Sequence, residues 1–295
     1  MKVGLSLSNN QGIAEVQDIV RLAVRAEALG LDSVWASDHV FNVGYVRERI
    51  GNRPYYDPLT MLTYIAAKTE RIALGTSVLV LPYHHPMRLA KAAATLDVMS
   101  CGRLVLGVGV GVIEQELNAM GNPYEERGAI TDETIDILKR LWTEDEPSHQ
   151  GRRYRFSGMA FSPKPVQKPH IPLLIGGVSR AAMRRAARLG NGWHPTAMPP
   201  EELRAAMSYL AQQAQAAGRS AADIPVSISI PMQGGRPGRY GLGVEAPEMV
   251  EKLHAFQRLG VDTVVVAPYT GEAQEMARAL EVLARDVIPA LPSPS

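Results

Sequence analysis

The residues best suited to chemistry follow short apolar runs of the chain. Ser37, Asp38 and His39 come directly after the run 33–36. A histidine at the end of a buried strand can act as an acid, a base or a hydrogen-bond donor. An Asp-His pair alone also fits an ordinary loop contact, so the pattern leaves a structural role equally open.

A second group of candidates follows the run 172–175. Gly176, Gly177, Val178 and Ser179 lead into a clear helical segment at 181–189. Free amide groups and the helix dipole both favour an anion at the start of a helix. Ser179 alone would be an N-cap residue, but the two glycines before it favour a phosphate-binding turn.

The run 72–81 contains Thr76, Ser77 and Val78. Small hydroxyl residues within a buried strand indicate a bulge or the close approach of a ligand. The alternative is a regular buried strand whose hydroxyl groups bond to the backbone.

The run 104–108 continues into alternating glycines, including Gly109 and Gly111. This is not the dinucleotide-binding fingerprint, because Val112 occupies the position that needs a third glycine. Glycines here would let the backbone approach a flat ring closely. A plain tight turn is the alternative.

Neither a metal site nor a serine hydrolase is indicated by the sequence. His84 and His85 are adjacent, so their side chains point in different directions and rarely bind one metal. The Gly-x-Ser-x-Gly elbow of the serine hydrolases does not occur. We therefore expect no bound metal.

Eight apolar runs alternate with helical segments and would position these candidates. The first helical segment, 13–29, ends at Gly30, where a C-terminal cap belongs. Near-continuous apolar strands indicate burial on both faces, as in a parallel sheet. Eight such repeats predict a closed (β/α)8 barrel, or TIM barrel, rather than an open doubly wound α/β sheet. The runs are 3–7, 33–36, 72–81, 104–108, 172–175, 192–194, 226–230 and 263–267.

Three segments exceed what a minimal barrel needs. They are 41–57 after the second strand, 144–169 after the fourth, with a predicted hairpin at 151–156, and 233–244 after the seventh. Loops that follow strands lie on the face where barrel enzymes place their sites, so the first and last are candidate lids. Surface decoration is the alternative. We assign 1–290 to one barrel domain and 291–295 to a disordered tail.

Composition narrows the classes of function. The chain has 295 residues, of which 46% are hydrophobic and 21% charged, and its net charge is +1. This balance argues against nucleic acid or an anionic membrane as the main partner and favours a small-molecule substrate. The single cysteine, Cys101, excludes an intrachain disulfide and indicates a reducing, cytoplasmic setting. The chain shows neither a bilayer-spanning run nor a signal-peptide pattern.

Taken in order, several segments resemble the bacterial luciferase-like superfamily of flavin and deazaflavin enzymes. These segments are 29–39, 85–86 with 95–104, 107–111, and 175–179 leading into 185–193. The resemblance implies a (β/α)8 barrel, often a homodimer, with an isoalloxazine-type ring at the C-terminal face of the strands. The subgroup indicated by residues 38–39, 107–111 and 120–128 is that of oxidoreductases using the deazaflavin coenzyme F420.

The resemblance also implies roles for individual residues. Asp38 and His39 would flank the head of the ring, and the 176–179 turn would bind the phosphate. Ser77 and Val78 match a position where members often carry a non-proline cis peptide, which forms a bulge behind the ring. The other expected cofactor contacts are Thr76, Gly109 and Gly111.

The sequence departs from one related group in an informative way. Deazaflavin-dependent sugar-phosphate dehydrogenases carry a glutamate acid directly after the glycine turn and a tryptophan shortly after the histidine. This chain has Val112 and Val43 at those positions, which argues against a sugar-phosphate substrate. His39 is then the candidate proton partner, because we expect Glu114 and Glu116 on a solvated helix face.

Three functions are compatible with these patterns. The first is hydride transfer between C5 of F420 and a small organic substrate, in which the ring performs the chemistry and His39 serves as proton partner or hydrogen-bond donor. The second is a two-component monooxygenase that uses reduced FMN from a separate reductase. The third is a flavin-binding carrier without turnover.

Overall fold

Eight parallel strands form a closed barrel in the computed structural model, which describes residues 1–232 and 240–291. The order in the sheet is β8-β7-β4-β3-β2-β1-β10-β9. Bridges from Trp193 to Val226 and from Thr196 to Ser229 join β8 to β9 and close the ring. The predicted (β/α)8 barrel is therefore confirmed. Its strands are β1 (Lys2–Ser6), β2 (Ser33–Ala36), β3 (Ala73–Val80), β4 (Leu104–Gly109), β7 (Leu173–Gly176), β8 (Gly192–His194), β9 (Ser227–Pro231) and β10 (Thr263–Ala267).

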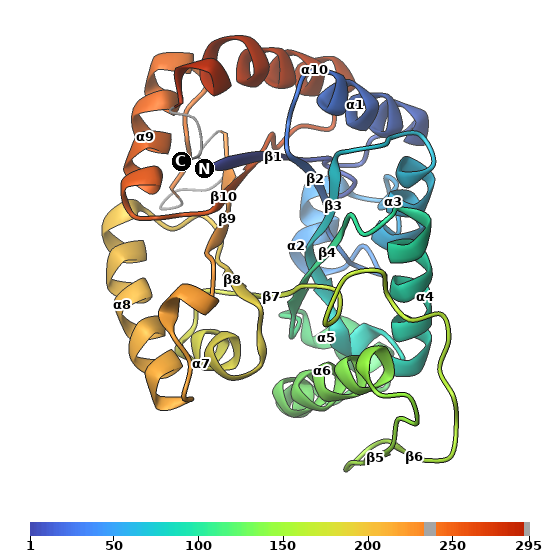
Figure 1. Cartoon of the computed structure of the whole chain (residues 1–295). Helices are drawn as coiled ribbons and strands as arrows, with labels where there is room; N and C mark the ends of the chain where they lie inside the picture. Colours follow the sequence, from blue (N-terminus) through green and yellow to red (C-terminus); the bar gives the residue numbers. More distant parts are fainter. Residues whose placement is uncertain (233–239, 292–295) are drawn as a thin grey trace.

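Helices surround the barrel on the outside (Figure 1). They are α1 (Val16–Ala28), α2 (Gly44–Ile50), α3 (Pro58–Ala66), α4 (Pro86–Met99), α5 (Glu114–Ala119), α6 (Arg127–Thr143), α7 (Arg180–Leu189), α8 (Pro200–Ala216), α9 (Ala246–Arg258) and α10 (Ala273–Val282). The last of these continues into a π-helical turn, Leu283–Val287. As predicted, α1 ends beside Gly30, whose φ of +84° suits a residue without Cβ. None of the helices in the described parts is long and apolar enough to cross a bilayer.

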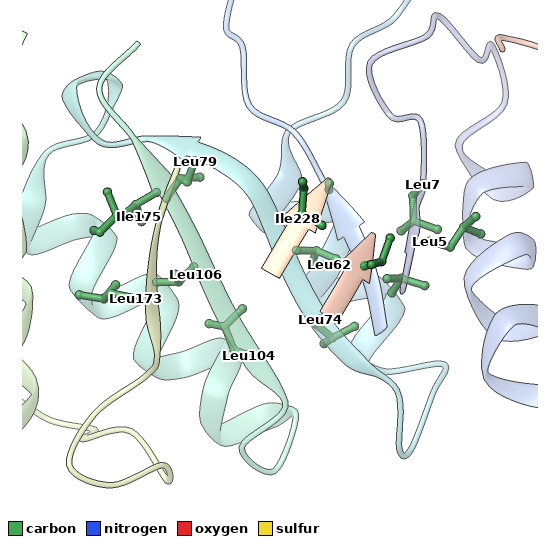
Figure 2. Packing of buried hydrophobic residues seen from close by; sticks show 14 of the residues in the cluster. Leu5, Leu7, Leu62, Leu74, Leu79, Leu104, Leu106, Leu173, Ile175 and Ile228 are labelled. Atoms are coloured by element: carbon green, nitrogen blue, oxygen red, sulfur yellow. The ribbon is translucent and has the colours of Figure 1, made fainter. Parts of the chain in front are cut away.

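Both faces of the strands are buried, as their near-continuous apolar sequence predicts. Leucines and isoleucines on the outer face, such as Leu74, Leu106 and Ile228, pack against the helices (Figure 2). On the inner face, Trp35 fills the barrel beside two glycines. A Cβ on Gly4 would lie 2.7 Å from Nε1 of Trp35, and one on Gly75 would overlap its ring. These glycines therefore make room for a large side chain in the barrel interior.

The inserted segments have different positions from one another. Segment 41–57 contains α2 and lies at the carboxyl end of β2. Segment 144–169 holds the predicted hairpin, made of β5 (His149–Gln150) and β6 (Arg155–Phe156). It lies between the fourth and fifth barrel strands in chain order but directly follows α6, beyond which it projects (Figure 1). The hairpin folds back along α6, because Arg152 and Arg153 form ion pairs with Glu126 at the N-terminal end of that helix, and its tip therefore lies toward the carboxyl ends of the strands.

Two sequence predictions fall mainly outside the described residues. They are the 233–239 part of the seventh-strand loop and the 292–295 part of the tail. The assignment of 1–290 to one domain stays a prediction.

Candidate active site

The predicted candidates gather along one edge of the barrel. Strands β2, β3, β4, β7 and β8 are consecutive neighbours in the sheet. The segments at their carboxyl ends therefore form one continuous rim, which carries residues 38–39, 77–78, 109–111, 176–179 and 194. Sequence reasoning placed the first four of these segments at strand ends, and the fold brings them to the same rim.

His39 is held by hydrogen bonds at both ring nitrogens. Its Nδ1 lies 2.7 Å from Oε2 of Glu116, and its Nε2 lies 2.7 Å from the hydroxyl of Tyr45. The rings of Tyr45 and Tyr55 stand edge-on to the imidazole, each with its centroid 5.6 Å away. The histidine is therefore fixed in position and only slightly exposed.

Glu116 is the buried acceptor at the centre of this network. Its Oε1 accepts from the backbone N–H groups of Val40 and Phe41, at 2.6 and 3.0 Å. Its Oε2 accepts from the hydroxyl of Tyr83 at 2.7 Å as well as from His39. Burial alone would raise the pKa of Glu116, but these hydrogen bonds outweigh it and hold the pKa below its usual range. Glu116 is therefore a carboxylate.

The expectation that Glu116 lies on a solvated helix face is wrong, whereas Glu114 is exposed as expected. The reason is the short helix α5. Its inner side is set by Ile113 and Leu117, which are buried one turn apart, and Glu116 lies on that side. This spacing was the signal in the sequence that could have identified Glu116 as a buried residue.

Asp38 is engaged by the protein itself. Its Oδ2 accepts from the backbone N–H of Val80 at 2.9 Å and lies 2.7 Å from Nε2 of His84. The carboxylate is buried, so it ties the end of β2 to the end of β3. Its expected contact with the head of a cofactor ring stays a prediction.

Strand β3 contains the bulge that its hydroxyl residues indicate. The peptide bond between Ser77 and Val78 is cis, and the pairing of β3 with β4 shifts register between Thr76 and Leu79. The hydroxyl of Thr76 donates to the carbonyl of Gly107 at 2.7 Å and is fully buried. Thr76 thus shows the backbone bond that the sequence left open as an alternative.

The glycines along the rim make room for side chains of β3. A Cβ on Gly109 would lie 2.7 Å from Cγ2 of Val78, and one on Gly176 would lie 2.6 Å from its Cγ1. Gly111 has a φ of +81° and faces Val80 in the same way, at 2.9 Å. The close approach visible in the structure is therefore to β3, and contacts of Gly109 and Gly111 with a cofactor stay a prediction.

His194 lies inside the barrel, and sequence reasoning did not identify it as a site residue. Its ring stacks on Trp35 with centroids 5.1 Å apart. Its Nε2 lies 2.8 Å from the hydroxyl of Ser77, and its Nδ1 lies 2.9 Å from that of Ser227. Burial lowers the pKa of His194 to about 4. The imidazole is therefore neutral at pH 7, and it contacts the bulge through Ser77.

His194 makes the stability of the protein depend on pH. Histidine in the unfolded chain has a pKa of about 6.5. The unfolded state therefore binds more protons than the folded state at pH values between this pKa and the folded-state pKa of about 4. The stabilisation is complete above pH 6.5 and is lost as the pH falls, by about 2–3 kcal/mol at pH 4.5. Urea unfolding of the wild type and of His194→Gln, above pH 6.5 and at pH 4.5, measures this loss of stability. The exposed-site control His85→Gln should keep the wild-type dependence, and an equal dependence in His194→Gln would contradict the assignment.

The turn before α7 has the features of an anion site. Ser179 is the N-cap of this ten-residue helix, and its hydroxyl accepts from the N–H of Ala182 at 3.2 Å. Residues 177–179 are exposed, and Gly177 has a φ of +109°. Within the described residues, the N–H groups of Val178, Ser179 and Arg180 form no hydrogen bond. Their donors are free for an anionic group.

The sequence matches a known protein family. Residues 1–236 match the family model described as luciferase-like monooxygenase. The chain belongs to this family. The resemblance inferred from the sequence is therefore confirmed.

Several relatives and solved structures resemble this family member. The chain is 33% identical over 236 residues to an F420-dependent glucose-6-phosphate dehydrogenase of Amycolatopsis mediterranei, covering 78% of this chain and 68% of the relative. It is 34% identical to the protein of the same name from Intrasporangium calvum, covering 69% and 60%, so the chain spans less than two thirds of that relative. An uncharacterized Mycobacterium tuberculosis protein is 28% identical over 288 residues, covering 91% and 94%.

The fold agrees with solved structures over nearly the full length. A monooxygenase from Streptomyces bottropensis superposes with a TM-score of 0.81 at 24% identity, covering 98% of this chain and 99% of that one. An F420-dependent secondary alcohol dehydrogenase, solved with an F420–acetone adduct, gives a TM-score of 0.84 at 18% identity, covering 99% of both chains. At these identities the agreement establishes the barrel fold.

Proposed function

We propose that this luciferase-like oxidoreductase transfers a hydride between coenzyme F420 and a small organic substrate. The observation that carries the proposal is the buried His39–Glu116 pair on the same barrel rim as the exposed turn 177–179. The deazaflavin-dependent relatives support F420 as the cofactor. When bound, the deazaflavin supplies the hydride chemistry, while the protein binds, orients and exchanges protons.

The residues present fit such a cofactor. The free N–H groups of Val178, Ser179 and Arg180, together with the dipole of α7, would hold its phosphate. His39 and the Ser77–Val78 bulge lie further along the same rim and would border the ring. Both ends of an elongated cofactor therefore have a complementary partner.

The surroundings of the pair favour an uncharged substrate over a sugar phosphate. Val112, which replaces the glutamate acid of the sugar-phosphate dehydrogenases, is exposed. Val40 and Phe41 are also exposed, and their backbone groups bind Glu116. Apolar side chains at this position suit a ketone, an alcohol or an unsaturated carbonyl compound.

A two-component monooxygenase using reduced FMN from a separate reductase is the second candidate function, favoured by the family description and the fold of the Streptomyces enzyme. Fluorescence titrations with F420 and with FMN, followed by oxygen consumption with free reduced FMN, separate the two. F420 that fails to bind the purified protein would overturn the first proposal. Tight binding without turnover of any substrate would indicate the carrier function instead.

We also propose a cytoplasmic homodimer. The assignment rests on the single cysteine and on the family resemblance. Light scattering of the purified protein measures the mass, and a monomeric mass would contradict the dimer.

The phosphate turn can be tested through its charge. Val178→Asp places a carboxylate among the free N–H groups, where it competes with the cofactor phosphate and repels it. We expect the affinity for F420 to fall about tenfold or more, which corresponds to about 1.4 kcal/mol. The neutral control of similar size, Val178→Asn, should bind F420 as the wild type does. Equal affinities for the two variants in a fluorescence titration would remove the turn from the site.

A further inference from the structure

We infer that the phenol of Tyr45 is the group that exchanges a proton with the substrate, that His39 accepts the proton of Tyr45, and that Glu116 positions His39. The inference rests on the proposed function and deepens it. Its first basis is that both ring nitrogens of His39 are already engaged, by Glu116 and by Tyr45. The imidazole therefore cannot reach a substrate without giving up one of these bonds.

The donors and acceptors of the network fix its direction. The carboxylate of Glu116 has only acceptors to offer, so Nδ1 of His39 must carry the proton between them. In a neutral imidazole Nε2 is then the acceptor, and the hydroxyl of Tyr45 donates to it. The three residues form a chain in which a buried carboxylate orients an imidazole, which in turn accepts from a hydroxyl.

The position of Tyr45 places it at the outer end of this chain. Glu116 is completely buried and the His39 side chain is 10% exposed, whereas Tyr45 is half-buried. Tyr45 lies in the first turn of α2, within the inserted segment at the carboxyl end of β2. The guanidinium of Arg49 lies 5.8 Å from the centre of its ring, within the range of a cation–π contact.

The step balances for oxidation of a secondary alcohol. The hydroxyl proton of the alcohol passes to the oxygen of Tyr45, while the former proton of Tyr45 passes to Nε2 of His39. The carbinol C–H bond breaks, its electron pair leaves as hydride to the oxidised deazaflavin, and the carbonyl double bond forms. His39 becomes an imidazolium between Glu116 and Tyr45 and then loses a proton to solvent. Reduction of a ketone follows the same path in reverse.

The arrangement of protons can be tested without cofactor or substrate. Nitrogen NMR of the purified protein should show His39 with a protonated Nδ1 and an unprotonated, hydrogen-bonded Nε2. Tyr45→Phe should alter only the Nε2 resonance, and Glu116→Gln should alter the Nδ1 resonance, because it replaces the carboxylate that accepts from Nδ1. The control Tyr64→Phe, an exposed position on α3, should leave all His39 signals unchanged. An Nε2–H tautomer in the wild-type protein would overturn the inference.

Turnover then tests the role of the phenol. With reduced F420 and acetone or cyclohexanone as probes, Tyr45→Phe should lower kcat about 100-fold and leave the Kd for F420 within about twofold of the wild type. The double variant Tyr45→Phe, His39→Asn should be no slower than the slower single variant, because the residues act as one unit. Retained kcat in Tyr45→Phe overturns the inference alone, whereas failure of F420 to bind overturns the proposed function.

Discussion

Replacing His39 with asparagine should lower turnover with F420 by about 10²–10⁴-fold, the range expected for loss of an acid–base group. Asparagine can still donate a hydrogen bond toward Glu116 in place of Nδ1. It cannot accept and return the proton that Nε2 exchanges with Tyr45. The variant should therefore keep the fold and the cofactor affinity and lose the chemical step.

The measurement is kcat and the Kd for F420 in the same preparation. His85→Asn is the matched control, because His85 is exposed at the start of α4 and bonds neither to His39 nor to Glu116. It should retain wild-type turnover. If His39→Asn also kept its turnover, the proton would have to travel by another route, and the proposed role of His39 would be wrong.

Replacing Glu116 with leucine should cost about 3–5 kcal/mol of the free energy of unfolding, the range for breaking a buried charged pair. The variant leaves the backbone N–H groups of Val40 and Phe41 without their carboxylate acceptor. It also removes the acceptor of the Tyr83 hydroxyl and of Nδ1 of His39. Urea unfolding at pH 7 measures the loss.

The contribution of Glu116 should depend on pH in a defined direction. The pKa of the carboxyl is lowered in the folded state, so its stabilisation is present above the unfolded value of about 4.3 and is lost as the pH falls through the folded value. The difference between the wild type and Glu116→Leu should therefore shrink in acid. Glu114→Leu, an exposed neighbour, should change stability little at any pH, and an equal loss in both variants would contradict the model.

The barrel itself followed from local patterns in the sequence. Strands β2, β8 and β10 have the predicted bounds, and even the three-residue β8 is present. Apolar runs and helical periodicity are properties of neighbouring residues, so they can be recognised without the fold. The same holds for the turn before α7, where two glycines, a serine and a helix lie next to one another.

The partners of the site residues followed from the tertiary structure alone. Glu116 and His39 are 77 residues apart, and Ser77 and His194 are 117 residues apart. The local sequence around Glu116 indicated a charged residue on the exposed face of a short helix. Only the packing of α5 against the end of β2 shows that Glu116 is buried.

By itself, then, the sequence determined the eight strands, the turn before α7 and the histidine at the end of β2. It did so because apolar spacing and glycine placement act over a few residues. The hydrogen bonds that link Glu116, His39 and Tyr45 depend on the closed barrel, which brings the ends of β2 and β4 to one rim. A hydrogen bond needs two groups within about 3 Å, and spacing along the chain does not encode that distance between remote segments.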